Sequence, residues 1–216
     1  MTARGRPRRD LLVAMVAELA PRLPPDAVIV DVGADHGHVT HALRTAGLPV
    51  VASERAPGIA GRPELPWVLA DGLAPFRRVD VAVIAGMGAR TIARILQRGP
   101  RPTVAAVLHA QDDPPRLRTW LAADGWRFEA EGLAPEARRY AEVMRVVPGE
   151  ETATGETLAL GPRLLSDGHP LLEAHLRQLH GHWTSIARAT HGHDALRHAA
   201  ARARVERIER AMQHRR

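Results

Sequence analysis

Residues 28–37, Val-Ile-Val-Asp-Val-Gly-Ala-Asp-His-Gly, constrain the fold of this chain more than any other segment. Four of the first five residues are apolar and three of these are valine, which predicts a short strand buried on both faces. After the glycine turn, apolar residues at helical spacing follow at Val39, Ala42 and Leu43. A strand, a tight glycine turn and a helix N-terminus together make a nucleotide pocket. The alternative is an ordinary strand-to-helix turn.

Two aspartates set the charge of this turn. Asp31 and Asp35 place negative charge where a pyrophosphate would lie. The turn therefore favours a cofactor with a cationic or neutral end, such as S-adenosylmethionine, over NAD or ATP. Gly33 allows the backbone to approach such a ligand closely.

Strands and helices are expected to alternate along most of the chain. Apolar runs predict further strands at residues 49–53, 67–70, 79–85 and 104–108, and a β-hairpin at 126–133 and 140–147 with a loop around Pro135. Apolar residues at helical spacing predict helices over 11–23, 37–46, 89–97 and 114–125. Prolines and glycines exclude a long helix over 56–66. The pattern predicts an α/β fold with a mostly parallel sheet and an antiparallel last strand.

Acidic residues and glycines follow these strands. Glu54 ends the second strand, where an acid holds the ribose hydroxyls of a nucleoside; the alternative is a surface carboxylate paired with Arg55. Asp71 is placed to accept the exocyclic amine of adenine, or is a turn aspartate before Gly72. Residues 86–88, Gly-Met-Gly, open the carboxyl edge of the sheet, where ligands bind in such folds.

Composition limits the class of protein. The 216 residues, 45% of them apolar, fit one domain plus an appendage. The net charge of +6 indicates a polyanionic partner; a GC-rich genome explains arginine in place of lysine, but not the positive excess. The chain has no cysteine, which excludes disulfides, and the histidine spacings predict no metal site. With no bilayer-length apolar run and no signal-peptide pattern, a cytoplasmic protein is expected.

The two ends of the chain are expected to differ from its centre. Residues 1–10 form a basic arm for phosphate contact, or a plain solvated tail, and residues 148–157 form a linker. Over residues 158–216, apolar residues step by four and three, which predicts a helical coiled-coil hairpin. Its seam is Leu172, Leu176, Leu179, Trp183 and Ile186, then Ala201, Val205, Ile208 and Met212. Arginines outside the seam favour RNA contact over a merely solvated face: Arg177, Arg188, Arg197, Arg202, Arg204, Arg207 and Arg210.

Six motifs, taken together and in order, resemble the bacterial tRNA (adenine(22)-N1)-methyltransferase family, TrmK-like. They are DVGADHGHVTHAL, VASER, LADGL, VAVIAGMG, LRTWLAADGW and YAEVMRVV. The family pattern is similar: D-I-G-S-D-H, G-D-G-L, I-A-G-M-G-G, L-R-x-W-L-x-x-x-G-W and Y-E-I. The later LGPRLLSDGHPLLEAHL is similar to the segment that opens the family's helical domain, so the resemblance covers nearly the whole chain.

The resemblance implies a Rossmann-like class I methyltransferase sheet over residues 11–148 that binds S-adenosylmethionine, and a helical domain that helps to grip tRNA. The implied reaction is methyl transfer to N1 of an adenine, at position 22 by family resemblance. The implied cofactor-binding residues are Asp31, Gly33, Asp35, His36, Glu54, Asp71, Gly72, Ala85, Gly86, Met87 and Gly88. By position, Asp35 and Asp112 are candidates to stabilise the positive charge of the methylated adenine, and Gln111 to orient the base.

Three departures from the family pattern keep alternatives open. The segment from Glu54 to Asp71 is shorter than in the family, and the last glycine of I-A-G-M-G-G is Ala89. The family's L-Q-P-N, thought to hold the target base, is Leu-His-Ala-Gln at 108–111. One alternative is an RNA-binding protein of methyltransferase fold with reduced catalysis. The other is a methyltransferase for another substrate, such as a small molecule, which the basic hairpin disfavours. The sequence does not indicate an oligomeric state.

Overall fold

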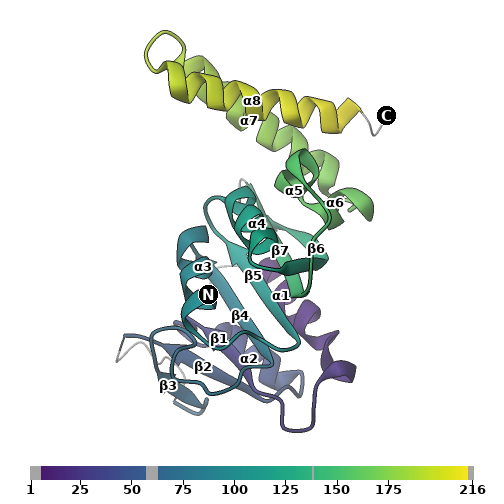
Figure 1. The fold of residues 1–216 in the computed structure, drawn as a ribbon. Helices are drawn as coiled ribbons and strands as arrows, with labels where there is room; N and C mark the ends of the chain where they lie inside the picture. The colour runs from purple at the N-terminus through teal and green to yellow at the C-terminus, as the bar shows by residue number, and fades with distance from the viewer. Residues whose placement is uncertain (1–5, 57–62, 138, 214–216) are drawn as a thin grey trace. The chain divides into compact units, whose positions relative to one another are not determined.

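The computed structural model describes residues 6–56, 63–137 and 139–213, and the chain divides into two compact units (Figure 1). The first unit ends at Arg163 and the second begins at Leu164. The predicted start of the helical domain, residue 158, lies instead inside α5 (Gly155–Leu160), a helix of the first unit. Because Leu158 of α5 packs into the core of the first unit, the boundary falls after this helix.

A seven-stranded sheet forms the centre of the first unit, with the strand order β3-β2-β1-β4-β5-β7-β6. Strands β1 to β5 are parallel, and β7 is antiparallel to both β5 and β6. This topology confirms the predicted α/β fold with a mostly parallel sheet. The strands are β1 (Ile29–Val32), β2 (Val50–Glu54), β3 (Trp67–Leu69), β4 (Val81–Met87), β5 (Ala105–Ala110), β6 (Trp126–Glu136) and β7 (Arg139–Pro148).

The order of the strands reverses beside β1. The chain proceeds outward from β1 to β2 and β3, and then returns to form β4 on the other side of β1. Ile29 of β1 thus lies between Val50 of β2 and Val81 of β4. In open sheets of this type, ligands bind outside the carboxyl ends of the strands at such a reversal.

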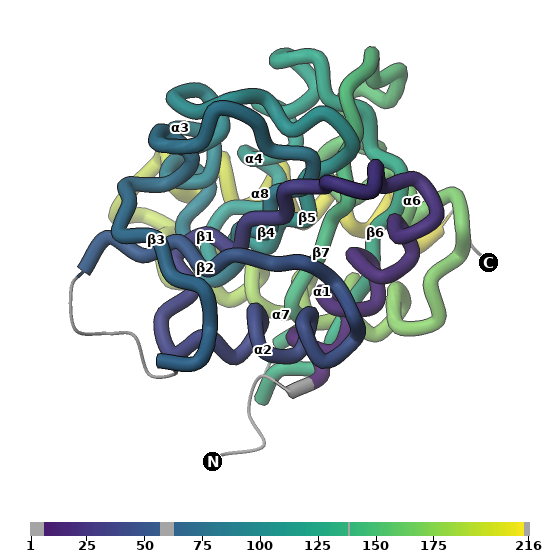
Figure 2. The backbone as a smooth tube through the Cα atoms, turned by 90° about the horizontal axis from the view of Figure 1, so that it is seen from below, coloured from purple at the N-terminus to yellow at the C-terminus, as the bar shows by residue number. Residues whose placement is uncertain are grey.

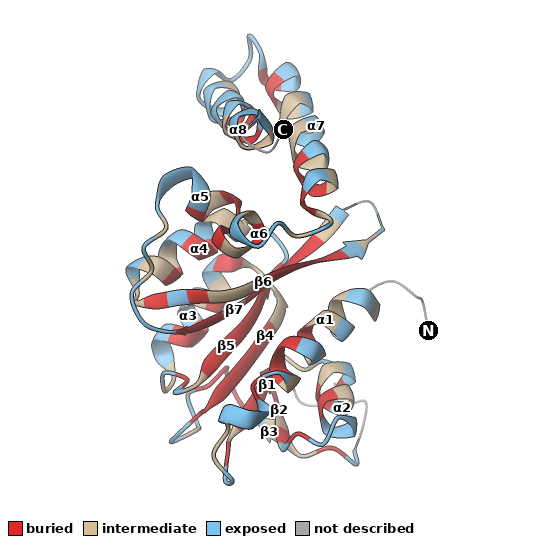
Figure 3. Ribbon diagram, turned by 90° about the vertical axis from the view of Figure 1, so that its right-hand side faces the viewer, coloured by how far each residue is buried: buried red, intermediate tan, exposed pale blue. Residues whose placement is uncertain are grey.

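Alternate residues of the central strands face two different layers of helices (Figure 2). Val30 and Ile84 pack in one cluster with α3 and α4, whereas Ile29 and Val83 pack in another with α1 and α2. Since both faces are covered, the central strands are buried (Figure 3), as their valine-rich sequences predict. The helices are α1 (Arg6–Ala17), α2 (His38–Thr45), α3 (Ala89–Arg98) and α4 (Pro114–Ala123).

The first helix differs from its prediction over residues 11–23. It begins at Arg6, inside the segment predicted as a basic arm, and ends at Ala17, before a short 3-10 turn at Ala20–Arg22. Arg8, in the first turn of this helix, explains the early start, because it forms an ion pair of 2.7 Å with Glu136 in β6. Residues 1–5 of the predicted arm lie outside the described residues.

Several strands are longer than predicted. β4 continues through Gly86 and Met87, with a bulge where Gly86 has a φ of 79°, so these residues close the strand instead of following it. The hairpin strands also continue further, and Pro135 pairs with Tyr140 instead of forming a loop. Proline is tolerated there because β6 is an edge strand. Between β2 and β3, described residues 55–56 and 63–66 contain no helix, as predicted, and 57–62 lie outside the description.

A buried arginine joins α4 to the β6–β7 hairpin. Arg118 is 1% exposed, and its guanidinium lies 2.7 Å from Glu131 and 2.7 Å from Glu142. Burial alone would lower the pKa of Arg118, but the two carboxylates raise it overall, so the side chain stays charged. The ion pairs therefore anchor the helix that follows the loop after β5.

The second unit consists mainly of α7 (Leu172–Thr190) and α8 (Ala195–Gln213), which follow the short helix α6 (Pro162–Ser166). The two long helices pack along one another and form the predicted helical hairpin (Figure 1). Within the described residues, no helix is both long enough and apolar enough to cross a membrane.

The predicted seam is present in α8 but only partly in α7. α8 buries Ala201, Val205 and Ile208 as predicted, whereas the predicted Met212 is only partly buried. α7 buries the predicted Leu172 and Leu176, whereas the later predicted seam residues are only partly buried: Leu179, Trp183 and Ile186. The second half of α7 instead buries Ala187 and Thr190. The second half of α7 is thus rotated relative to the predicted pattern, and it brings polar residues toward α8.

Candidate active site

Asp31 stabilises the turn after β1 from within. Its carboxylate is 3% exposed and accepts hydrogen bonds from the backbone N–H of Thr40, at 2.9 Å, and from the Thr40 hydroxyl, at 2.6 Å. The turn between them has left-handed backbone at Gly33, Asp35 and Gly37, with φ values of 69°, 50° and 69°. Asp31 therefore ties the end of β1 to the first turn of α2, and its carboxylate is directed at Thr40 instead of solvent.

The ionisation of Asp31 reflects this burial. Desolvation raises the pKa of the carboxyl to about 6, against the lowering effect of the two hydrogen bonds from Thr40. The group is therefore mainly charged at neutral pH. It places a negative charge beneath the turn, which favours a cationic group above it.

Glu54 links the end of β2 to the same turn. One of its carboxylate oxygens accepts a hydrogen bond from the N–H of Asp35 at 3.2 Å. The other accepts from the backbone N–H groups of Arg55, at 2.8 Å, and Ala56, at 3.2 Å. The contact with Arg55 is thus made to its backbone and not to its guanidinium. Asp35 is itself exposed, and its carboxylate lies 3.9 Å from the exposed ring of His36.

The segment after β3 lies beside Glu54. The N–H of Ala70 donates to the backbone carbonyl of Glu54 at 2.9 Å, and the buried hydroxyl of Ser53 donates to the carbonyl of Gly72 at 3.0 Å. These two bonds hold the exposed Asp71 at the carboxyl edge of the sheet, beside Glu54 of the neighbouring strand β2.

The ends of β1 and β4 meet at the reversal of strand order. A Cβ atom on Gly33 would overlap the Cε methyl of Met87, so only glycine allows this approach. A Cβ on Gly86 would meet nothing within 4 Å, which shows open space beside that contact. Ala85, Gly86, Met87 and Gly88 are all partly exposed along this opening.

The loop after β5 supplies the cap of α3. Asp112 Oδ1 accepts hydrogen bonds from the N–H groups of Ala89 and Asp113, both at 2.7 Å. The bond from Ala89 lowers the pKa of Asp112, so this exposed carboxylate stays ionised. Ala89, where the family pattern has glycine, is buried at the start of α3.

Gln111 lies between Asp112 and β5, with its backbone fixed on both sides. Its N–H donates to the carbonyl of Met87 at 3.0 Å, and its carbonyl accepts from Arg139 at 3.1 Å. The residue is exposed, and the structure gives its side-chain amide no partner among the described residues. The amide is therefore free to bind a ligand at this edge.

His109, two residues earlier, points into the protein. It is 2% exposed, its Nδ1 lies 3.0 Å from the carbonyl of Glu142, and its Nε2 lies 3.3 Å from the Arg8 guanidinium. Burial lowers the pKa of His109, so the neutral ring donates through Nδ1 and accepts through Nε2. His109 therefore holds α1 and β7 together and does not take over the role of the family's exposed amide.

The structure brings most of the predicted residues to one edge of the first unit. Asp35, Glu54, Met87 and Asp112 are joined there by the contacts described above, with Asp71 beside them. Asp31 and Gly72 support this edge from buried positions. The sequence analysis missed the supporting hydroxyls of Thr40 and Ser53 and the contact from Arg8. Of these three, only Thr40 has a sequence signal, because it is a hydroxyl residue in the first turn of the helix that follows Asp31.

Residues 64–213 match the family model of the tRNA (adenine(22)-N(1))-methyltransferases. The chain belongs to this family. No curated protein sequence matches the chain. As a member of the tRNA (adenine(22)-N(1))-methyltransferase family, it is a methyltransferase that uses S-adenosylmethionine and modifies N1 of adenine in tRNA. The match includes the Asp71 turn, the Gly86–Gly88 motif, the loop at Gln111 and the helical hairpin.

Solved structures share the fold of this family member. A protein of the NADB-Rossmann superfamily from Streptococcus agalactiae is 24% identical, with a TM-score of 0.77 over 93% of this chain and 96% of that one. The B. subtilis M1A22 tRNA methyltransferase TrmK is 20% identical, with a TM-score of 0.75 over 93% and 97%. M. capricolum TrmK, in complex with S-adenosyl-homocysteine, is 16% identical, with a TM-score of 0.73 over 93% and 96%. The first unit is thus the expected Rossmann-like methyltransferase sheet.

Within the described residues, no group of three or more histidine or acidic side chains could hold a metal ion.

Proposed function

We propose that this chain methylates N1 of the adenine at position 22 of tRNA, at the carboxyl edge of its sheet. The observation that carries this proposal is the series of contacts along that edge, from Glu54 through Asp35 and from Gly33 through Met87 to the Asp112 loop. The series crosses the reversal of strand order, so one edge of the sheet can hold the methyl donor and the acceptor base side by side.

The β1–β3 side of this edge fits S-adenosylmethionine. Asp35, Glu54 and Asp71 offer carboxylates to a cationic nucleoside, while the Gly86 backbone faces open space. We assign Glu54 to the ribose hydroxyls and Asp71 to the adenine amine, with Gly33, His36, Gly72 and residues 85–88 forming the walls. When bound, S-adenosylmethionine supplies a methyl group activated by a positively charged sulfonium. To bind a ribose, Glu54 would exchange its hydrogen bonds to Arg55 and Ala56 for hydroxyl donors.

The β5 side of the edge fits the acceptor base. N1 of adenine is already nucleophilic at neutral pH, so the main task is alignment of the base, which has to leave its stack or pair. Gln111 presents a free amide that can pair with the exocyclic amine of the adenine. Asp112, kept ionised by the N–H of Ala89, and the exposed Asp35 stabilise the positive charge that methylation places on the base.

Two transcripts that differ in one nucleotide test the proposal. One tRNA carries adenine at position 22 and the other guanine, and both are incubated with the protein and methyl-labelled S-adenosylmethionine. We expect 1-methyladenosine in the first transcript only, identified by nucleoside mass spectrometry and mapped by fragment analysis. A methylated nucleoside other than 1-methyladenosine, or equal labelling of both transcripts, would contradict the proposed substrate.

Calorimetry with S-adenosylmethionine separates this proposal from an RNA-binding protein of reduced catalysis. We expect a dissociation constant on the order of micromolar. Binding of tRNA without measurable binding of S-adenosylmethionine would favour the alternative, whose structural basis would be the Glu54 carboxylate, already bonded to three backbone N–H groups.

A further inference from the structure

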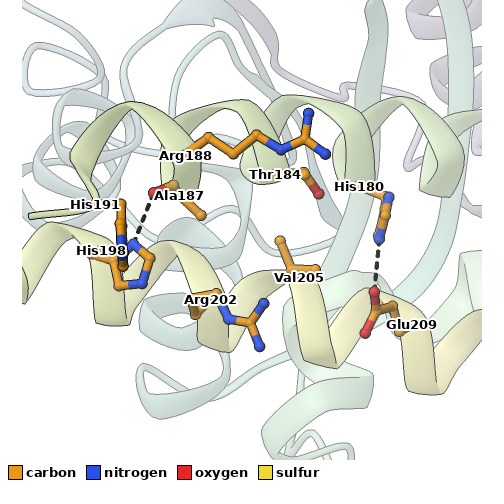
Figure 4. A pocket seen from close by; sticks show the side chains of 9 residues that line it. All are labelled: His180, Thr184, Ala187, Arg188, His191, His198, Arg202, Val205 and Glu209. Atoms are coloured by element: carbon orange, nitrogen blue, oxygen red, sulfur yellow. Dashed lines mark hydrogen bonds and ion pairs between the residues drawn. The ribbon is translucent and has the colours of Figure 1, made fainter.

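A groove of about 420 Å³ lies between the two long helices of the second unit (Figure 4). Nine residues from α7 and α8 line it, and all of them belong to the second unit. Val205 is its buried apolar floor, whereas most of the other lining side chains carry nitrogen or oxygen. The exposed lining is largely apolar carbon, and a few nitrogen and oxygen groups set into it determine which ligand can bind.

The charge of the groove is positive. Arg188 and Arg202 line it, together with three histidines, whereas Glu209 is the one acid among its described lining residues. Glu209 lies 2.9 Å from Nε2 of His180, so its charge has a partner at one end of the groove. The guanidinium of Arg188 forms no hydrogen bond or ion pair with any described residue, and that of Arg202 has only a 3.4 Å contact with Glu206 on its own helix.

An unused hydroxyl lies in the same groove. Thr184 Oγ1 is buried and has no hydrogen-bond partner among the described residues. This is unusual within its own helix, because the hydroxyl of Thr190 donates to the carbonyl of Ile186 at 2.8 Å. A buried hydroxyl without a partner normally indicates a missing ligand, water or ion. Thr184 therefore marks a position where an acceptor atom would be bound.

The far end of the groove adds imidazole groups. Nδ1 of His198 lies 2.8 Å from the carbonyl of Ala187, and the ring of His191 lies 5.0 Å from that of His198 (Figure 4). Because Nδ1 donates to Ala187, Nε2 of His198 accepts in the neutral ring and donates to a phosphate oxygen only when the ring is protonated. Two guanidinium groups, a hydroxyl and imidazoles are the groups that bind phosphate oxygens in proteins.

We propose that this groove is a phosphate subsite, and that a backbone phosphate of the tRNA occupies it between Arg188 and Arg202. This inference rests on the proposed function, since it takes tRNA as the substrate. It adds a defined site to the general expectation that the arginines of the helical hairpin contact RNA. Three other arginines of the hairpin, Arg177, Arg197 and Arg210, are exposed and add diffuse positive charge.

Charge-matched variants test the subsite. Arg188→Gln and Arg202→Gln each remove one positive charge inside the groove, and Arg197→Gln removes one from an exposed position of α8 outside it. We expect each groove variant to weaken tRNA binding by about tenfold and to reduce the salt dependence of log K by about one. We expect less than about a twofold change for Arg197→Gln. Equal losses in all three variants would overturn the subsite in favour of diffuse attraction.

Thr184→Val tests the site without changing charge or shape. We expect this variant to bind tRNA about threefold more weakly, while its thermal unfolding temperature does not fall, because no hydrogen bond of the protein is lost. Unchanged tRNA binding would show that the hydroxyl has no ligand and would remove it from the site.

A titration with inorganic phosphate identifies the source of the ligand. Ring signals of His191 and His198 are followed by NMR on addition of phosphate or tRNA. We expect saturation with tRNA but not with millimolar phosphate. Saturation by phosphate alone, lost in Arg188→Gln, would assign the groove to a small anion instead.

Failure of the proposed function and failure of the subsite give different results. If the proposed function is wrong, the unaltered protein forms no 1-methyladenosine. If only the subsite is wrong, methylation is intact and the groove variants bind tRNA as strongly as Arg197→Gln.

Discussion

The two sides of the sheet's carboxyl edge are held by different means. On the β1–β3 side the supports are short: the Thr40 hydroxyl on Asp31, the Ser53 hydroxyl on Gly72, and backbone bonds to Glu54. On the β5–β7 side the supports are long charged side chains from segments distant in sequence. Arg8 contacts Glu136, Arg118 contacts Glu131 and Glu142, Arg139 contacts Gln111, and Arg145 contacts Glu18 and Glu129.

This difference explains which part of the site can be predicted from the sequence. A turn held by its own glycines and by a hydroxyl nine residues away carries its geometry in a short motif. A strand end held by an arginine from a distant segment, as His109 in β5 is by Arg8, 101 residues away, has no local pattern. The acceptor side therefore tolerates a change such as histidine for the family's glutamine, provided that the distant partner fits.

Arg118→Met is the variant expected to have the largest effect on this comparison. It leaves Glu131 and Glu142 buried without their cation, and we expect the free energy of unfolding to fall by about 3–5 kcal/mol. Urea denaturation measures the change. Arg177→Gln, which removes an exposed pair with Glu173, is the control and should cost no more than about 0.5 kcal/mol. Similar values for both variants would mean that the charged supports of the β5–β7 side contribute little.

Gly33→Ala tests the β1–β3 side. Gly47, with a φ of 83° and no atom within 4 Å of an added Cβ, provides the matched control Gly47→Ala. Both variants should lose about 1 kcal/mol of stability from the left-handed backbone. In Gly33→Ala alone the Met87 methyl has to move, and we expect S-adenosylmethionine to bind about tenfold more weakly in calorimetry. If displacement of Met87 is the cause, Gly33→Ala in a Met87→Ala background should have no further effect on binding.

The sequence predicts the β1–β3 side well and the β5–β7 side poorly. The valine-rich strands, the glycine turn and the position of Glu54 follow from local patterns, and the structure has them where they were expected. The ends of β4 and β5 were predicted two residues too early; in β4 the reason is that glycine in a bulge resembles glycine in a turn. The start of α1 was missed because its first turn depends on Glu136, and the burial of His109 because it depends on Arg8.

Gln111→Ala tests the acceptor role on the β5–β7 side. Loss of one hydrogen bond to the base should lower kcat/KM for tRNA by about tenfold, with unchanged binding of S-adenosylmethionine. Gln111→Asn keeps an amide at this position and should lose less activity than Gln111→Ala. Equal loss in both variants would argue against recognition of the base through the amide, and weaker S-adenosylmethionine binding would place Gln111 on the cofactor side instead.

Asp31 gives the smallest expected effect. Since burial raises the pKa of its carboxyl from 3.8 to about 6 on folding, the protonated form favours the folded state, and stability falls as the pH rises through this range. From pH 5 to pH 7, the free energy of unfolding should fall by about 1 kcal/mol more in the unaltered protein than in Asp31→Asn. Asp26→Asn is the control, because Arg78 lowers the pKa of Asp26 and moves its titration below this window. Parallel stability curves for the unaltered protein and Asp31→Asn would mean that water reaches Asp31, so the short supports of the β1 turn would be looser than the charged supports on the opposite side.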